Sequence, residues 1–342
     1  MFPLTVWYAV GVALRNLYYD RRTSKSQKQD KEPITIGIGN LRMGGTGKTP
    51  HTEYLIRLFS GQKIALLSRG YGRKTKGFVL ADGNANNNNN SKLIGDEPAM
   101  IARKFPDITV AVSENRAEGL EQLSQLQDSP HLILLDDVYQ HRRVRPDLLI
   151  LLTEYGDPYF LDHILPFGNL REFRSGSRRA DIIVVTKCPP SMSKSRRQKY
   201  RERLKIQPHQ KLFFSQIKYM FPQPLFPDTQ RSELDLQGCR TILLVTGIAH
   251  SEPLKRYLEK RCTVKHLCFP DHHDFTERDC QQIVDAYHAI KTPAKAIITT
   301  EKDAMRLQNL QLQAVQDSFY YIPICVTFLE GDDFDRTVKA ML

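Results

Sequence analysis

A glycine-rich segment with a lysine and a threonine follows an apolar run near the start of the chain. The run ITIGIG (34–39) leads into NLRMGGTGKTP, and a helical pattern starts near His51. Backbone amides in such a loop, with the N-terminus of the next helix, bind phosphate oxygens. Lys48 would reach the β- and γ-phosphates, and the Thr49 hydroxyl would bind Mg²⁺. The residues expected at the phosphates are Arg42, Met43, Gly44, Gly45, Thr46, Gly47, Lys48 and Thr49.

One position of this segment departs from the usual pattern GxxxxGK[ST], because Arg42 stands where the first glycine is expected. The alternative is a chance GTGKT in a turn. The strand pattern before the loop and the helical pattern after it favour a phosphate-binding loop.

A second apolar run, LILLDD (132–137), ends in two carboxylates, Asp136 and Asp137. A strand that ends in an acid is where P-loop enzymes hold Mg²⁺ or its water shell. Guanine-specific proteins carry NKxD after a late strand, but in TEKD (300–303) Thr300 replaces the asparagine. The sequence therefore predicts a site for ATP and Mg²⁺, with Thr49, Asp136 and Asp137 as metal ligands.

Apolar runs rich in β-branched residues alternate with helical patterns, which predicts an α/β fold. We expect a P-loop NTPase-like, doubly wound, mainly parallel sheet with a second, smaller α/β domain. The predicted limits are 1–20 for an N-terminal helix, 21–215 for the nucleotide-binding domain, 216–240 for a linker, 241–318 for the smaller domain, and 319–342 for a return strand and C-terminal helix.

The N-terminus is apolar and is followed by positive charge. Residues 1–14 carry no charged side chain, Arg15, Arg21, Arg22, Lys25, Lys28 and Lys31 follow, and the whole chain has a formal net charge of +11. A helix of fourteen residues spans about 21 Å, short of the roughly 30 Å hydrocarbon core. We predict an interfacial helix with a basic collar on an anionic membrane. The alternative is a helix packed on the protein's own core.

Several further segments occur in an order that resembles one enzyme family over nearly the whole chain. They are GNLRMGGTGKTP (39–50), SRGYGR (68–73), GDEP (95–98), DDVYQH (136–141), GNLRE (168–172), FPDHHDF (269–275) and TTEKDAMRL (299–307). Together they resemble the tetraacyldisaccharide 4′-kinases, the lipid A kinases. This chain has Val138 and Tyr139 where the family usually has DDGFQH, and Asn169 where it usually has PLRE.

The resemblance implies transfer of a phosphoryl group from ATP, with Mg²⁺, to the 4′-hydroxyl of an acylated glucosamine disaccharide 1-phosphate lipid. It also implies a peripheral or monotopic protein on the cytoplasmic face of the inner membrane. Asp96 matches the family's catalytic carboxylate, and His272 matches the histidine paired with it. A carboxylate can accept the proton of the attacking hydroxyl. We expect closure of the two domains to bring Asp96 and His272 together.

Asp96 and His272 also allow structural roles in place of catalytic ones. Asp96 could instead cap a helix, since Glu97 and Pro98 follow it. The pair His272 and His273 could form a surface turn or part of a metal site.

Seven other residues in the matched segments could contact the substrate or the metal shell, or form surface salt bridges instead. They are Arg69, Arg73, Arg116, Gln140, His141, Arg171 and Glu172. The sequence assigns no function to Glu301, Lys302 and Asp303.

Two other function classes fit parts of the sequence. A nucleic-acid-associated P-loop ATPase fits the positive charge, but aromatic residues are not interleaved with the basic ones as a stacking surface requires. A soluble P-loop kinase of small molecules would leave the N-terminal helix in the protein's core. We predict neither a nucleic-acid partner nor a protein partner.

Overall fold

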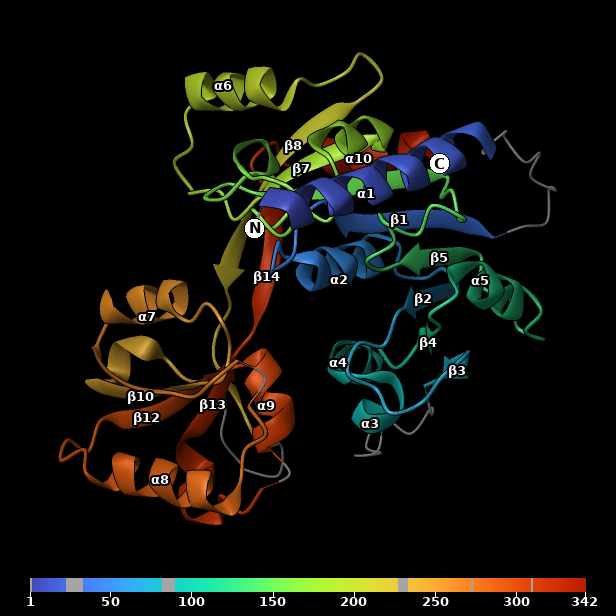
Figure 1. Ribbon diagram of the computed structural model, residues 1–342. Coiled ribbons are helices and arrows are strands. Elements are labelled where there is room, and N and C mark those ends of the chain that lie inside the picture. Colours follow the sequence, from blue (N-terminus) through green and yellow to red (C-terminus); the bar gives the residue numbers. More distant parts are fainter. Residues whose placement is uncertain (1, 23–32, 82–89, 227–232, 272, 309) are drawn as a thin grey trace. The chain divides into compact units, whose positions relative to one another are not determined.

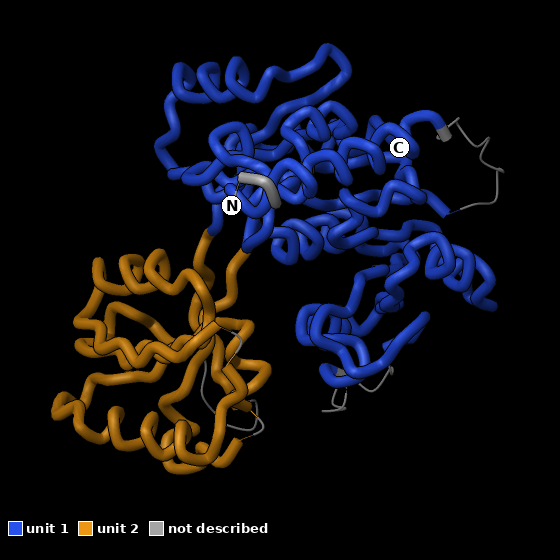
Figure 2. Tube along the Cα trace, viewed as in Figure 1, with its two compact units in different colours: residues 1–217, 326–342 blue, residues 218–325 orange. Residues whose placement is uncertain are grey.

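The chain forms two compact units. The structure, a computed structural model, describes residues 2–22, 33–81, 90–226, 233–271, 273–308 and 310–342. Unit 1 comprises residues 1–217 and 326–342, and unit 2 comprises residues 218–325 (Figure 2). The chain leaves unit 1 within strand β8 (Lys211–Tyr219) and returns within strand β14 (Ile324–Phe328).

Unit 1 is built on a nine-stranded sheet with the order β14-β8-β7-β6-β1-β5-β2-β4-β3 (Figure 1). Strands β1, β2, β4, β5, β6, β7 and β8 pair in parallel, and β3 pairs antiparallel with β4. Besides β8 and β14, the strands are β1 (Ile34–Asn40), β2 (Ile64–Ser68), β3 (Val79–Leu80), β4 (Thr109–Val112), β5 (Leu132–Leu135), β6 (Leu148–Glu154) and β7 (Ile182–Thr186).

Helices cover both faces of this sheet. Alternate strand residues such as Ile36, Leu66 and Leu134 form one core cluster with apolar side chains of α2, α4 and α10. Their neighbours point to the opposite face, where residues of α5 and α6 pack. The helices of unit 1 are α1 (Phe2–Arg22), α2 (Lys48–Leu58), α3 (Asn90–Ile94), α4 (Asp96–Lys104), α5 (Arg116–Ser124), α6 (Lys194–Leu204) and α10 (Asp333–Met341), with short 3-10 turns at Tyr159–Leu161 and Arg174–Arg179.

Unit 2 contains a five-stranded sheet with the order β11-β10-β12-β13-β9. Its first four strands are parallel, and β9 pairs antiparallel with β13. The strands are β9 (Gln223–Pro224), β10 (Thr241–Thr246), β11 (Thr263–Cys268), β12 (Lys295–Thr300) and β13 (Phe319–Ile322). The helices are α7 (Glu252–Glu259), α8 (Glu277–His288) and α9 (Glu301–Leu307), with 3-10 turns at Leu236–Gly238 and Gln313–Ser318.

Helix α1 carries exposed apolar side chains and also contacts other segments of unit 1. Trp7 is 75% exposed and Leu14 is 63% exposed. On the side facing unit 1, the Tyr8 hydroxyl donates to the Arg171 carbonyl over 3.0 Å, and Asp20 forms an ion pair with Arg142. Across the described ranges, no helix combines the length and apolar character needed to span a bilayer.

The predicted fold class is confirmed, because a mainly parallel sheet lies between two layers of helices and a smaller α/β unit follows. The sequence pattern missed β8, where Ser215, Gln216 and Lys218 interrupt the apolar run. In the predicted linker 216–240 lie the end of β8, strand β9 and a 3-10 turn. The predicted return strand and C-terminal helix of 319–342 lie in different units, since β13 belongs to the sheet of unit 2 and α10 to unit 1.

The C-terminal helix α10 contributes Phe334 and Val338 to the core of unit 1. Phe334 is 2% exposed, and its ring stacks on that of Phe328 with 3.8 Å between the ring centroids. Replacing Phe334 with alanine leaves a cavity, so we expect the free energy of unfolding to fall by about 3–5 kcal/mol. Urea unfolding followed by circular dichroism measures this change. The exposed Lys339→Ala on the same helix is the control, and an equal effect of both substitutions would contradict the prediction.

Candidate active site

The phosphate-binding loop lies between the end of β1 and the start of α2. Gly47 has a φ of 88° directly before Lys48, the first residue of the helix, and Gly44 has a φ of 108°. Residues with a side chain rarely adopt these angles, so both glycines are required by the course of the backbone. Lys48 and Thr49 lie in the first turn of α2, which begins three residues before the helical pattern expected from His51.

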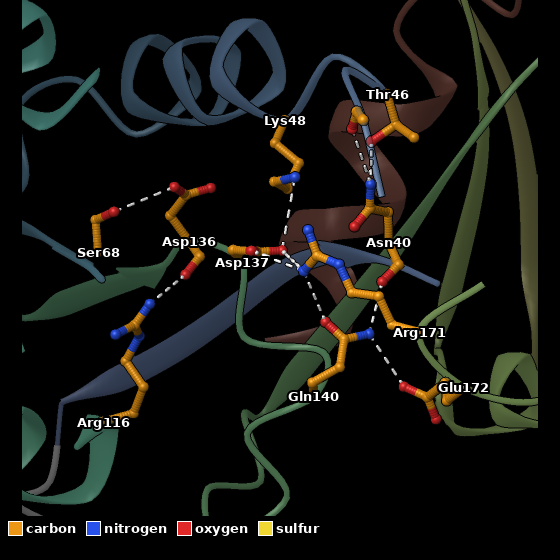
Figure 3. Close-up of polar contacts among 11 residues, drawn as sticks. Asn40, Thr46, Lys48, Ser68, Arg116, Asp136, Asp137, Gln140, Arg171 and Glu172 are labelled. Atoms are coloured by element: carbon orange, nitrogen blue, oxygen red, sulfur yellow. Dashed lines mark hydrogen bonds and ion pairs between the residues drawn. The ribbon is translucent and has the colours of Figure 1, made fainter. Parts of the chain in front are cut away.

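Two side chains and one backbone carbonyl from outside the glycine-rich segment hold this loop. The Asn40 amide donates to the Thr46 hydroxyl over 2.9 Å, and the Thr186 hydroxyl donates to the Thr46 carbonyl over 2.8 Å (Figure 3 shows the Asn40 contact). The Met43 amide donates to the Asn169 carbonyl over 2.8 Å. The loop is therefore held in shape by contacts that the motif itself does not contain.

His51 supports the loop from within α2. Its Nδ1 lies 2.7 Å from the Gly47 carbonyl and its Nε2 lies 2.8 Å from the Ser215 hydroxyl. A carbonyl only accepts, so Nδ1 carries the proton and Nε2 accepts from Ser215. Burial lowers the pKa of His51 to about 4, although the bond to Gly47 opposes this change.

Asp137 binds two cations at the end of β5. The Lys48 Nζ lies 3.6 Å from Asp137 Oδ1, and the Arg171 Nη1 lies 2.9 Å from Asp137 Oδ2 (Figure 3). Burial alone would raise the pKa of Asp137, but Lys48 and Arg171 outweigh it and keep this pKa below its usual value. Lys48 of the loop and Asp137 after β5 therefore form an ion pair, because β1 and β5 are neighbours in the sheet.

Asp136 is buried, and only one of its two carboxylate oxygens accepts a hydrogen bond from the described residues. The Ser68 hydroxyl donates to its Oδ2 over 3.3 Å, and its Oδ1 has no hydrogen-bond partner in the part of the chain that the structure describes. Burial, followed by the nearby charge of Glu97, raises the pKa of Asp136 to about 6, while Lys48 and Arg116 oppose this rise. A buried, unsatisfied carboxylate beside another acid fits a cation or its water shell.

Glu97 is a residue of this site that the sequence reasoning missed. It is the second residue of α4, and its charge acts on Asp136. Gly95 occupies the capping position of α4, so the alternative that Asp96 is the cap residue is wrong. Asp96 is the first residue of the helix. His272 lies outside the described residues, so its predicted pairing with Asp96 stays a prediction.

Arg116 and Arg73, predicted as possible phosphate ligands, are buried in structural contacts. Arg116 is 1% exposed, and its Nη2 donates to the Asp136 carbonyl over 3.0 Å. The Arg73 side chain is 3% exposed and binds Glu114 and the Gly77 carbonyl. Arg116 thus fixes the backbone beside the acids, and Arg73 joins two loops. Neither guanidinium group is open to a ligand in this structure.

Arg171, Gln140 and Glu172 form one polar network. The Gln140 Nε2 donates to the Asn40 carbonyl over 2.8 Å and to Glu172 Oε1 over 3.1 Å, and Gln140 Oε1 accepts from Arg171 over 3.2 Å (Figure 3). Glu172 is fully buried, so it cannot contact a substrate directly. Arg69 is exposed, and burial together with the charges of Arg116 and Arg69 lowers the pKa of His141 to about 4.

The sequence departures at Val138 and Tyr139 are accommodated by glycines of β1. A Cβ atom at Gly39 would lie 2.6 Å from the Cβ of Tyr139, and one at Gly37 would lie 2.7 Å from a methyl group of Val138. The Tyr139 hydroxyl donates to the Gly176 carbonyl over 2.8 Å. Val138 and Tyr139 are therefore both buried in the core directly after Asp137.

In unit 2, the distinctive segment TEKD begins a helix. The Thr300 hydroxyl accepts from the Asp303 amide, and the buried Asp303 carboxylate accepts from the Gly247 amide over 3.0 Å. His273 binds Asp279, which belongs to the capping box of α8. Asp303 and His273 thus hold the loops that follow the parallel strands of this unit.

Comparison with known proteins gives the family. A family model described as tetraacyldisaccharide-1-P 4′-kinase matches residues 1–342. This chain belongs to that family. Two relatives named tetraacyldisaccharide 4′-kinase come from Flavobacterium johnsoniae, with 43% identity over 99% of this chain and 95% of the relative, and from Bacteroides fragilis, with 41% identity over 99% and 91%.

A solved structure of the same family has the same fold. It is the crystal structure of LpxK from Aquifex aeolicus in complex with ATP, with a TM-score of 0.75 and 26% identity over 99% of this chain and 98% of that chain. The family match and the named relatives support the kinase interpretation. They do not favour the two alternative function classes.

The buried His51 makes stability depend on pH. With a folded pKa of about 4 against 6.5 when unfolded, the unfolded state binds more protons in this window, so stability falls as pH falls from 6.5 to 4. We expect the free energy of unfolding of the wild type to fall by up to about 3 kcal/mol more than that of His51→Gln. Urea unfolding across this range measures the difference. The exposed His131→Gln should follow the wild type, and parallel curves for wild type and His51→Gln would contradict the expectation.

Proposed function

We propose that this protein transfers the γ-phosphoryl group of ATP to the 4′-hydroxyl of tetraacyldisaccharide 1-phosphate, which gives the bisphosphorylated lipid A precursor. The observation that carries the proposal is the cluster of Lys48, Asp137 and Arg171 beside the phosphate-binding loop. The whole-chain family match supplies the acceptor lipid, and the ATP complex of the Aquifex aeolicus relative supports the donor.

The backbone amides of residues 44–49 bind the phosphates in this proposal. Lys48 binds the β- and γ-phosphate oxygens and offsets the charge that develops there. Thr49 and Asp136 would hold Mg²⁺, which when bound neutralises phosphate charge and orients the transferred group. No group of three or more His, Cys, Asp or Glu side chains in the described ranges is arranged as a metal site.

Asp96 acts as the general base in the proposed mechanism. It accepts the proton of the 4′-hydroxyl as the new bond to the γ-phosphorus forms. The bond from that phosphorus to the oxygen bridging to the β-phosphate breaks in the same step, and ADP leaves. His272 is proposed to orient Asp96. Arg171 and Asp137 orient Lys48, because the carboxylate lies between the two cations.

Loss of the Lys48 side chain should strongly slow phosphoryl transfer while the protein stays folded. Lys48→Met removes the charge that stabilises the transferring group, so we expect kcat to fall on the order of 10²–10³-fold or more. Asp96→Asn should cause a similar loss. The assay follows label from γ-labelled ATP into purified disaccharide 1-phosphate lipid, with and without Mg²⁺.

The exposed Lys63→Met is the matched control and should retain wild-type activity. Label that reaches a soluble sugar or nucleoside but not the lipid would overturn the assignment.

We also propose that the protein acts peripherally at the cytoplasmic face of the inner membrane, where α1 lies in the interface with its basic collar near anionic lipid headgroups. The exposed apolar side chains of α1 support this location. Trp7→Ser combined with Leu14→Ser removes much of this apolar surface, so we expect the share of protein that floats with anionic vesicles to fall severalfold.

Phe221→Ser removes an aromatic side chain of unit 2 that is 62% exposed, and it serves as the control. Equal flotation of the α1 variant and the wild type would refute a role of α1 at the membrane.

A further inference from the structure

Arg179 lies at the far end of the polar network that reaches Asp137. Its Nη1 donates to Glu172 Oε2 over 2.8 Å, and its Nη2 donates to Glu172 Oε1 over 3.1 Å and to the Tyr139 carbonyl over 3.1 Å. The guanidinium also lies over the Tyr139 ring, 4.6 Å from its centroid. A fork of two parallel bonds to a carboxylate is a geometry that arginine makes and lysine does not.

Glu172 is fully buried and forms an ion pair with Arg179. A buried carboxylate without a cation is strongly destabilised and becomes neutral or reorients. Arg179 donates to both oxygens of the Glu172 carboxylate and thereby fixes its orientation. Glu172 can therefore serve as a permanent acceptor for its other neighbour, Gln140.

Gln140 links Glu172 to Arg171 through hydrogen bonds of its side-chain amide. Its Nε2 faces two acceptors, Glu172 and the Asn40 carbonyl, so its Oε1 faces the Arg171 guanidinium. If the Glu172 acceptor were lost, the amide could turn and present N–H groups to Arg171, which carries only donors. Arg171 would then lose a contact that directs it to Asp137.

We propose that Arg179 is a positioning residue for phosphoryl transfer, which acts through Glu172 and Gln140 to hold Arg171 on Asp137 beside Lys48. The inference rests on the proposed function for its catalytic consequence. The geometric consequence, the orientation of Arg171, is independent of the reaction. Arg179 itself does not contact Asp137, and three side chains separate the two.

The first test compares Arg179→Lys with Arg178→Met, which removes the exposed neighbouring arginine. Lysine keeps the positive charge but loses the fork and the flat contact with Tyr139. We expect kcat for lipid phosphorylation to fall about 10–100-fold, the usual cost of losing a residue that orients a ligand-binding side chain. The KM for the lipid and the unfolding midpoint should change little. Arg178→Met should match the wild type.

A double-mutant cycle with Arg171→Lys separates positioning from general stability. If Arg179 acts through Arg171, the double variant should lose about as much kcat as Arg171→Lys alone, because both changes break the same path. Independent, multiplying losses would overturn the inference. A wild-type kcat in Arg179→Lys would also overturn it. The same holds if the loss of kcat in Arg179→Lys is fully explained by the fraction of unfolded protein.

A variant that lacks both buried charges tests the positioning role by its structure, without a measurement of kinase activity. Arg179→Met with Glu172→Leu removes both members of the ion pair and the acceptor that faces Gln140, so no uncompensated charge remains and folding is expected. Its crystal structure should show Arg171 displaced from Asp137, and an unchanged Arg171–Asp137 ion pair would refute the positioning role. Wild-type protein that transfers no label to the lipid would instead refute the proposed function.

Discussion

The ion pairs of Asp137 with Lys48 and Arg171 depend on the direct pairing of β1 with β5. The parallel register Ile36↔Leu134 and Gly37↔Leu135 brings both strands to an end at the same edge of the sheet. One strand leads into the phosphate-binding loop and the other into the two acids. The sheet therefore brings a lysine and a carboxylate together from segments about ninety residues apart in the sequence.

The two neighbouring acids have opposite environments. Asp137 receives two cations and keeps a low pKa, whereas Asp136 is buried next to Glu97 and has a raised one. This difference supports separate roles, with Asp137 orienting Lys48 and Asp136 available to a metal ion. The sequence showed only two adjacent carboxylates and left open which of them would bind the metal.

Much of the fold and part of the site could be predicted. Continuous apolar strands, interposed helical patterns and a glycine-rich loop are local features, and they gave the parallel sheet and Lys48 beside the acids. Strand β8 was missed because its polar residues interrupt the apolar pattern. Asn40, His51, Thr186 and Arg179 were missed because no local motif indicates that these side chains meet the loop or the acidic network.

The sequence by itself determined the phosphate-binding loop, the acidic strand end and the family, because each depends on residues that are adjacent in the chain or on their order. Only the tertiary structure decided which charged residues are open to a ligand. Arg73, Arg116 and Glu172 resemble substrate contacts in sequence, yet all three are buried in ion pairs or bonds to carbonyl groups. Burial depends on neighbours that come from distant segments, and the pattern of residue types does not specify them.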